Sequence, residues 1–173
     1  MFTRIAVAIS IFCLVFPAAA PAQRFAQGDK EVLLNGAGVS DSDFDSTIFS
    51  IQGSLGYFLT DHIEAAVRQS VAFTSVEGGG SSWNAATRGA LDYNFDMGRF
   101  WPFVGASLGY IYGDDVSDTW AAGLEGGLKF FVSDTAFLLG MLQWEWFFND
   151  DNNDGGFDDG QWVYMVGIGF RWQ

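Results

Sequence analysis

From residue 31 onward the chain alternates apolar and polar side chains with a period of two, and this pattern constrains its fold more than any other feature. In the segment 83–95 the odd positions are apolar, small or threonine, while the even positions include Asn84, Arg88 and Asp92. The segments 138–148 and 161–172 repeat the pattern, with aromatic and aliphatic residues on one face. Such alternation is typical of β-strands that have two unlike faces. We therefore expect an all-β fold.

Eight such segments are expected, near 31–40, 47–59, 63–75, 83–95, 101–113, 119–131, 136–148 and 161–172. The connections at 60–62, 96–99 and 133–135 are short, whereas those at 41–45, 77–82, 114–118 and 149–160 are polar loops that are longer on average. An even number of strands with short turns at one end and longer loops at the other is typical of outer-membrane barrels. The predicted fold is an eight-stranded antiparallel up-and-down transmembrane β-barrel.

A soluble eight-stranded ligand barrel is the structural alternative, and the position of the aromatic residues decides against it. A soluble barrel hides its aromatic residues inside, whereas here they share the face opposite Arg, Glu and Gln. Threading the strands up and down predicts two aromatic girdles, one for each membrane interface. They comprise Trp83, Tyr112, Trp120, Trp146 and Trp162 at the loop end, and Tyr57, Tyr93, Trp101, Phe130 and Trp172 at the turn end.

Residues 1–22 are interpreted as a cleaved secretory signal peptide, which leaves a barrel domain over 23–173. Arg4 precedes an apolar run over 5–16, and small residues at 20–22 precede Gln23. The run is too short for a transmembrane anchor, which needs about 20 apolar residues. The single cysteine, Cys13, lies in this leader, so the mature chain has no thiol for a disulfide, a zinc site or a nucleophile.

The net charge of −13 excludes a nucleic-acid partner, because there is no surplus of Lys and Arg to neutralise phosphates. Twelve acidic residues fall in the four longer loops, which contain no Lys or Arg. The simplest interpretation is that the acidic charge keeps these loops soluble and makes them repel other negative groups at the cell surface. The more specific alternatives are binding of divalent cations, cation-bridged contact with lipopolysaccharide phosphates, and attraction of basic host or phage proteins.

The alternation also assigns eight charges to the interior. The acids are Glu64, Asp92, Glu125 and Glu145, and the bases are Arg68, Arg88, Lys129 and Arg171. Because the interior of an eight-stranded barrel is only wide enough for side chains, these charges are expected to pair in a neutral, plugged lumen. Arg68 and Asp92 are expected to form one buried, mutually dependent pair. The alternative is a narrow gated pore that opens when the network exchanges partners.

Over 30–172 the chain resembles the small eight-stranded outer-membrane barrels of the OmpA/OmpX type. Gly167, Phe170 and Trp172 resemble the C-terminal signal that such proteins present to the assembly machinery, with departures at Met165 and Gln173. The resemblance implies an outer-membrane location, contact with membrane lipid and lipopolysaccharide, assembly by that machinery, and a structural or surface-interaction role for a monomer. The gated alternative also resembles what is argued for OmpA-type barrels.

A lipid A-modifying enzyme is a second alternative, because barrels of this size include a palmitoyltransferase and a deacylase that use His with Ser near the outer leaflet. The only histidine, His62, falls in a predicted periplasmic turn, at the wrong end for lipid A. Glu145 with Asp92 would be a paired-carboxylate candidate, but basic neighbours explain both residues better. Without a general base of the usual kind, we expect no catalytic activity.

The loop segment 150–158 resembles a calcium loop, and no other cofactor is expected. Its ligand pattern is D-x-N-x-D-G. The segment departs from a calcium loop at the twelfth position, where Gln161 stands in place of a bidentate glutamate. A solvated acidic hairpin is the alternative. The candidate ligands are Asp150, Asn152, Asp154, the carbonyl of Gly156 and Asp158, with Gly155 at the turn.

We predict that any calcium site in this loop is weak, with a Kd on the order of 0.1–1 mM, because one bidentate anion is missing. Calorimetric titration of the wild type and of Asp154→Ala in detergent measures this. Heat no larger than that of a magnesium control argues against the site, and identical isotherms for the two proteins place any binding elsewhere.

Overall fold

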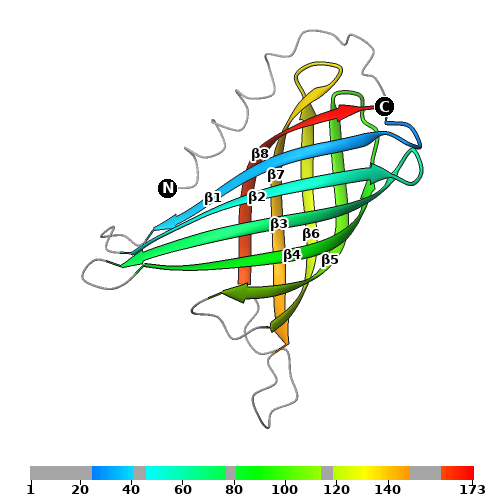
Figure 1. The fold of residues 1–173 in the computed structure, drawn as a ribbon. Helices are drawn as coiled ribbons and strands as arrows, with labels where there is room; N and C mark the ends of the chain where they lie inside the picture. The colour runs from blue at the N-terminus through cyan, green and yellow to red at the C-terminus, as the bar shows by residue number, and fades with distance from the viewer. Residues whose placement is uncertain (1–24, 41–45, 77–80, 114–118, 149–160) are drawn as a thin grey trace, which may run out of the picture.

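Eight antiparallel strands pair in chain order, and β8 pairs with β1 to close a barrel (Figure 1). The computed structural model describes residues 25–40, 46–76, 81–113, 119–148 and 161–173. The strands are β1 (Lys30–Ser40), β2 (Ser46–Phe58), β3 (Ile63–Val76), β4 (Ser81–Asn94), β5 (Phe100–Gly113), β6 (Thr119–Phe131), β7 (Ala136–Phe148) and β8 (Gln161–Trp172). The predicted fold class is confirmed.

The strand bounds follow the alternation closely. The predicted ranges of β6, β7 and β8 match those of the structure, and the others differ by at most two residues at an end. At 11 to 14 residues, the strands are long enough for the 9–11 that a tilted strand needs to cross a bilayer. Within the described residues, no helix has both the length and the apolar character of a membrane-spanning helix.

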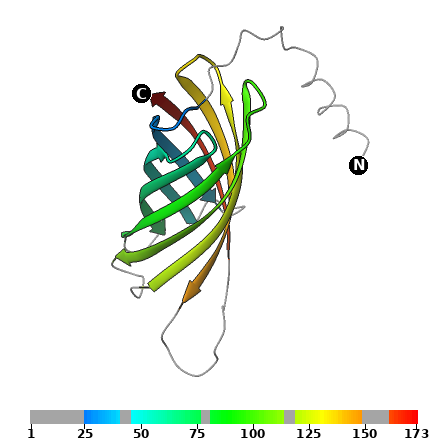
Figure 2. The same ribbon diagram turned by 90° about the vertical axis from the view of Figure 1, so that its right-hand side faces the viewer.

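The barrel has a turn end and a loop end. The first residue of β1 and the last residue of β8 lie at the turn end, together with the three short connections between β2 and β3, β4 and β5, and β6 and β7 (Figures 1 and 2). Side chains close two of these turns: Thr60 Oγ1 accepts from Ile63 N at 2.9 Å, and Ser133 Oγ accepts from Ala136 N at 3.0 Å. Gly98 supplies a positive φ of 76° in the third.

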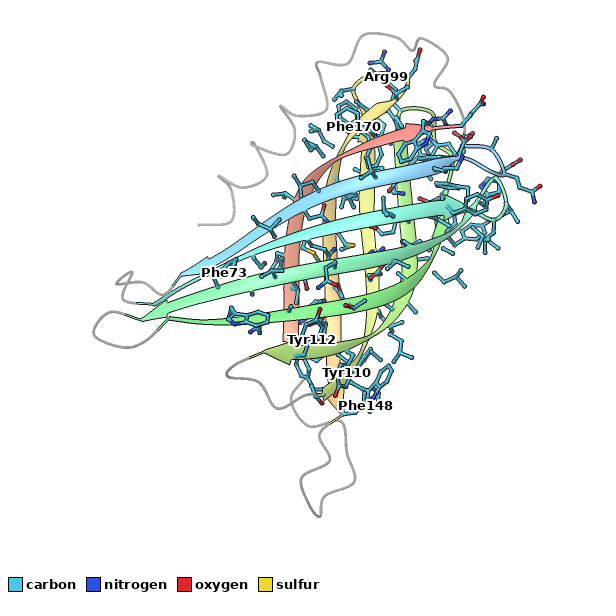
Figure 3. The ribbon with its side chains drawn as sticks, in the orientation of Figure 1. Phe73, Arg99, Tyr110, Tyr112, Phe148 and Phe170 are labelled. Carbon is cyan, nitrogen blue, oxygen red and sulfur yellow. The ribbon has the colours of Figure 1, made fainter. Side chains whose placement is uncertain are left out.

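The outer wall is apolar along its whole circumference. Leu55, Val67, Leu124 and Val166 are all more than half exposed, which only an apolar surrounding would favour for so many large side chains. Figure 3 shows aromatic residues toward both ends, with Phe73, Tyr110, Tyr112 and Phe148 on the loop-end half and Phe170 near the turn end. Exposed apolar side chains between two aromatic belts are the surface that a bilayer covers.

Trp101 is the exception to the predicted girdles. It is 1% exposed, faces the interior, and donates from Nε1 to the carbonyl of Gly98 at 2.9 Å. The phase of β5 explains this, because Trp101 and Phe103 both point inward while Phe100 and Val104 point outward. Phe100 therefore takes the outward position at the start of β5 that the sequence analysis gave to Trp101.

Three polar side chains on the outer wall satisfy one another. Thr87 donates to Gln69 Oε1 at 2.6 Å, and Gln69 Nε2 donates to the hydroxyl of Tyr112 at 3.2 Å. Polar groups in a hydrocarbon surrounding are costly unless they find a partner within the protein. This cluster on β3, β4 and β5 is therefore compatible with a wall that faces lipid.

The fold predicts that the mature chain, refolded in detergent, gives a strand-dominated circular dichroism spectrum and migrates differently on gels before and after boiling. The reason is that a closed barrel leaves no strand edge at which detergent can begin to open it. A helix-dominated spectrum, or a chain fully soluble without detergent, contradicts the membrane-barrel assignment.

Candidate functional site in the barrel interior

The structure places all eight predicted interior charges inside the barrel, and all but Arg88 are fully buried. Arg88 is partly buried, and its Nη2 lies 2.7 Å from Glu145 Oε1. Around this pair, Arg88 Nη1 donates to Ser70 Oγ at 3.2 Å and Gln143 Nε2 donates to Glu145 at 3.0 Å. One acid and one base, surrounded by hydrogen bonds, form the part of the network closest to the loop end.

Lys129 is shared by two acids. Its Nζ lies 2.7 Å from Glu31 Oε2 and 2.7 Å from Glu64 Oε2, and all three residues are buried. The side chains come from β6, β1 and β3, so this triad crosses the lumen rather than following one wall. The sequence analysis assigned Lys129 and Glu64 to the interior but did not assign Glu31. Its position, in phase with the buried Leu33 and Asn35, is the pattern that could have revealed it.

Arg68 is also shared by two acids. Its Nη2 lies 2.7 Å from Asp92 Oδ2, and its Nη1 lies 2.5 Å from Glu125 Oε1. In the strand register Arg68 faces Arg88 and Asp92 faces Glu64, so Arg68 reaches Asp92 along a diagonal. The expected buried pair of Arg68 and Asp92 is present, and Glu125 binds the same guanidinium as a third member.

A neutral interior was predicted from the sequence, and the structure corrects this prediction. Among the described residues, the buried acids outnumber the bases by six to four, an excess of two negative charges. Asp29 and Glu31 account for the difference, and the Nη1 of Arg171 lies 3.3 Å from Asp29 Oδ2. The six acids are Asp29, Glu31, Glu64, Asp92, Glu125 and Glu145, and the four bases are Arg68, Arg88, Lys129 and Arg171.

An aromatic cluster fills the turn end of the lumen. Phe25, which precedes β1, stacks on Phe58 with 4.0 Å between ring centroids and meets Trp101 edge-on at 5.0 Å. The Nζ of Lys129 lies 5.3–5.6 Å from the ring centroids of four phenylalanines, close enough for cation–π attraction. These rings are Phe25, Phe58, Phe103 and Phe137. Sequence alternation could not reveal this cluster, because it includes a residue that lies before the first strand.

The segment 25–29 is held in the barrel mouth by hydrogen bonds. Gly28 N donates to the carbonyl of Phe58 at 2.9 Å, and Phe58 N donates to that of Asp29 at 2.9 Å, so the segment extends the pairing of β1 with β2. Gly28 has a φ of 94°, a conformation that favours glycine. Asp29 Oδ2 accepts from Ala26 N at 3.0 Å and also contacts Arg171. The segment is thereby fixed over the aromatic cluster.

Inward-facing glycines make room for the larger interior groups. Gly105 faces Asp92 in the register, and a side chain at Gly105 would collide with the Asp92 carboxylate. Gly109 faces Arg88 in the same way, and Gly169 faces the ring of Phe137. The narrow lumen holds a large side chain on one strand because the neighbouring strand contributes none at that level.

The remaining predicted residues lie partly within the described residues and partly outside them. Phe170 and Trp172 point outward from β8, and Gly167 faces Asn35, where a Cβ would collide with the side-chain amide. His62 lies in the turn after β2, and its Nδ1 is 3.1 Å from the carbonyl of Asn94. The predicted signal peptide over 1–22, the candidate calcium loop at 150–158 and all twelve acidic loop residues lie outside the described residues.

Comparisons with known proteins agree with the fold. No family model and no curated protein matches the chain. Among solved structures, the N-terminal β-barrel domain of Pseudomonas aeruginosa OprF superposes with a TM-score of 0.59 at 20% identity, covering 85% of this chain and 98% of that one. Neisserial surface protein A gives 0.57 at 16% identity, covering 84% and 96%. The outer membrane protein OprG of Pseudomonas aeruginosa gives 0.55 at 14% identity, covering 87% and 98%.

The shared feature is the fold of small outer-membrane barrels, as the sequence analysis expected from its resemblance. The match extends over nearly the whole length of each solved chain. In the described residues, no group of three or more His, Cys, Asp or Glu side chains could hold a metal ion.

For the interior, we predict that Arg68→Met lowers the free energy of unfolding by about 3–5 kcal/mol, because it leaves two buried carboxyl groups without their cation. Urea unfolding in detergent micelles measures this. The double variant Arg68→Met/Asp92→Leu should recover only part of the loss, because Glu125 remains unpaired. Arg99→Met, at a turn, is the matched control and should change stability by less than about 0.5 kcal/mol. Full recovery in the double variant would show that Glu125 does not depend on Arg68.

Proposed function

We propose that this chain is an outer-membrane β-barrel protein with a plugged lumen, and that it acts in a structural or cell-surface interaction role by holding acidic loops outside the cell. The observation that carries the proposal is the contrast between the two faces of the wall. Large apolar side chains such as Leu55 and Val166 are exposed outside, while the charged side chains of the strands, apart from Lys30 at the turn end, lie inside.

The outer-membrane location is supported by the lipid-compatible outer wall and by the shared fold. Exposed Tyr57, Tyr93 and Trp172 surround the turn end, and exposed Trp83, Trp120 and Trp162 surround the loop end. Aromatic side chains prefer both interfaces of a bilayer. Phe170 and Trp172 alternate outward on β8, which supports their proposed role as the signal read by the outer-membrane assembly machinery. Gly167 has a second role there, since Asn35 occupies the space of its missing side chain.

The plug is supported by two successive layers inside the barrel. The aromatic cluster around Phe25 fills the turn end, and the charge network from Lys129 to Glu145 fills the middle. Exposed fractions of 1% for Phe25, 2% for Lys129 and 4% for Arg68 indicate that water has little access to either layer. A narrow pore would need both layers to move, so the observed packing favours a structural role over conduction.

We propose that the acidic loops interact with their surroundings through charge. Twelve acids without a Lys or Arg would bind divalent cations and, through them, the phosphates of lipopolysaccharide, or would attract basic proteins. The loop 150–158 is the proposed calcium ligand set. The barrel would act as a monomer, since its wall closes on itself without a free strand edge.

We propose no catalytic role. Lipid A chemistry would need an acid–base residue near the outer leaflet, and the only histidine of the chain, His62, lies at the turn end. Glu145 contacts Arg88, and Asp92 contacts Arg68, so both carboxylates of the paired candidate are engaged by cations. These contacts support a structural use of the two acids.

The plug predicts that the refolded protein gives no discrete conductance steps in a planar bilayer and does not hydrolyse or acylate lipid A. The same preparation should show the heat-dependent gel shift, which controls for correct folding. Discrete channels would contradict the plug and favour a pore. Turnover of lipid A would contradict the structural role and favour an enzyme.

A further inference from the structure

The excess negative charge of the interior is localised in two places. Each of the two triads contains two carboxylates and one cation: Glu31 and Glu64 around Lys129, and Asp92 and Glu125 around Arg68. The two triads are neighbours, because Glu64 and Asp92 face each other in the register of β3 and β4. Four carboxyl groups thus lie together around two cations.

Among the described residues, no base beyond the four already counted lies in the interior to remove this excess. Arg88 contacts Glu145, and Arg171 contacts Asp29 and faces Glu31 in the register, so each of the two remaining bases already has an acid to balance. The elements packed around the Lys129 triad contribute aromatic rings from β2, β5 and β7, together with Arg68 from β3 and Arg171 from β8. Around the Arg68 triad, β5 contributes Gly105 and Ser107, and β7 contributes Gln143 and Glu145. With these groups included, the balance remains six acids to four bases.

Asp92 gives an independent indication of how the excess is removed. It is 2% exposed, and its Oδ1 has no hydrogen-bond partner among the described residues, while Oδ2 accepts from Arg68. An ionised oxygen buried without a donor is costly, whereas a protonated carboxyl carries no charge and supplies a donor of its own. Among the described residues, no group of three or more His, Cys, Asp or Glu side chains could hold a metal ion.

We propose that each triad is a proton-binding site, so that the folded barrel holds two protons that its unfolded chain does not. One proton is shared within the pair Glu31 and Glu64, and the other within Asp92 and Glu125. Each triad then contains one carboxylate, one carboxylic acid and one cation, and its net charge is zero. This inference concerns the ionisation of the interior and does not depend on what the loops bind.

The proposal fixes the sign of the pH dependence. Above about pH 5 the carboxyls of the unfolded chain are ionised, so unfolding releases the two protons. Stability therefore falls as the pH rises. While the native state keeps both protons, the unfolding equilibrium constant should increase about hundredfold per pH unit, since each proton contributes a factor of about ten.

The test replaces one acid of each triad by the amide that imitates its protonated form. Urea unfolding in detergent is measured against pH for the wild type, Glu31→Gln, Asp92→Asn and the double variant. Each single substitution should lower the increase in the unfolding equilibrium constant from about hundredfold to about tenfold per pH unit. The double variant should remove both proton contributions. Glu145→Gln is the matched control. It removes the partner of Arg88 from a balanced pair, so it should lower stability at every pH and leave the pH dependence unchanged.

Infrared spectroscopy of the folded protein in D₂O gives a readout that does not need reversible unfolding. The wild type should show a protonated carboxyl band at neutral pH, and Glu31→Gln/Asp92→Asn should lose it. Loss of stability in Asp92→Asn with an unchanged pH dependence, or a wild type without the band, would overturn the proposal. Stability that follows sodium or magnesium concentration rather than pH would overturn it as well, since a cation would then neutralise the triads.

Discussion

The narrow interior of an eight-stranded barrel is the constraint on which the rest of this structure depends. Such an interior leaves space for side chains and little else. Every inward position must therefore hold a group whose charge, hydrogen bonds and packing are matched by its neighbours. The chain meets this requirement with glycine opposite large groups, as at Gly105 beside Asp92, and with cations shared between acids, as at Lys129. The outer wall is free of this constraint and needs only to be apolar. The proposed role follows from this division, because a filled interior favours a structural barrel over a pore and leaves interaction with the surroundings to the acidic loops.

The sequence was sufficient to predict the strands and eight of the ten described interior charges, because both depend on local alternation. Asp29 and Glu31 were missed. The phase of each strand identifies which side chains point inward, so Arg68, Asp92 and Lys129 could be assigned before their partners were known. Partners are not local, since a triad draws on three strands whose relative height depends on the register of the whole barrel. The sharing of Arg68 by Asp92 and Glu125 was missed for this reason. Trp101 was assigned to the wrong face because Phe100 beside it is also aromatic. Phe25 was not assigned at all, because it lies before the first strand.

The two layers of the interior support each other physically. Lys129 belongs to both, since its ammonium group contacts Glu31 and Glu64 on one side and faces four aromatic rings on the other. Phe25 completes this cage from outside the strands, and Arg171 covers its ring at 5.0 Å. The segment before β1 is thus part of the barrel interior rather than a tail. Deleting or extending it would act on Lys129 and, through Lys129, on the acids that share it.

The central claim, that the interior is closed to water-borne solutes, can be tested by thiol labelling, because the chain beyond Cys13 contains no cysteine. Ala90→Cys would place a thiol in the buried wall beside the Arg68 triad, and Asp134→Cys would place one in an exposed turn. A small charged methanethiosulfonate reagent should modify the turn thiol of the refolded, signal-free protein rapidly and leave the interior thiol unmodified until the barrel is unfolded. Rapid modification of Ala90→Cys in the folded barrel would show that the lumen is open and would contradict the account.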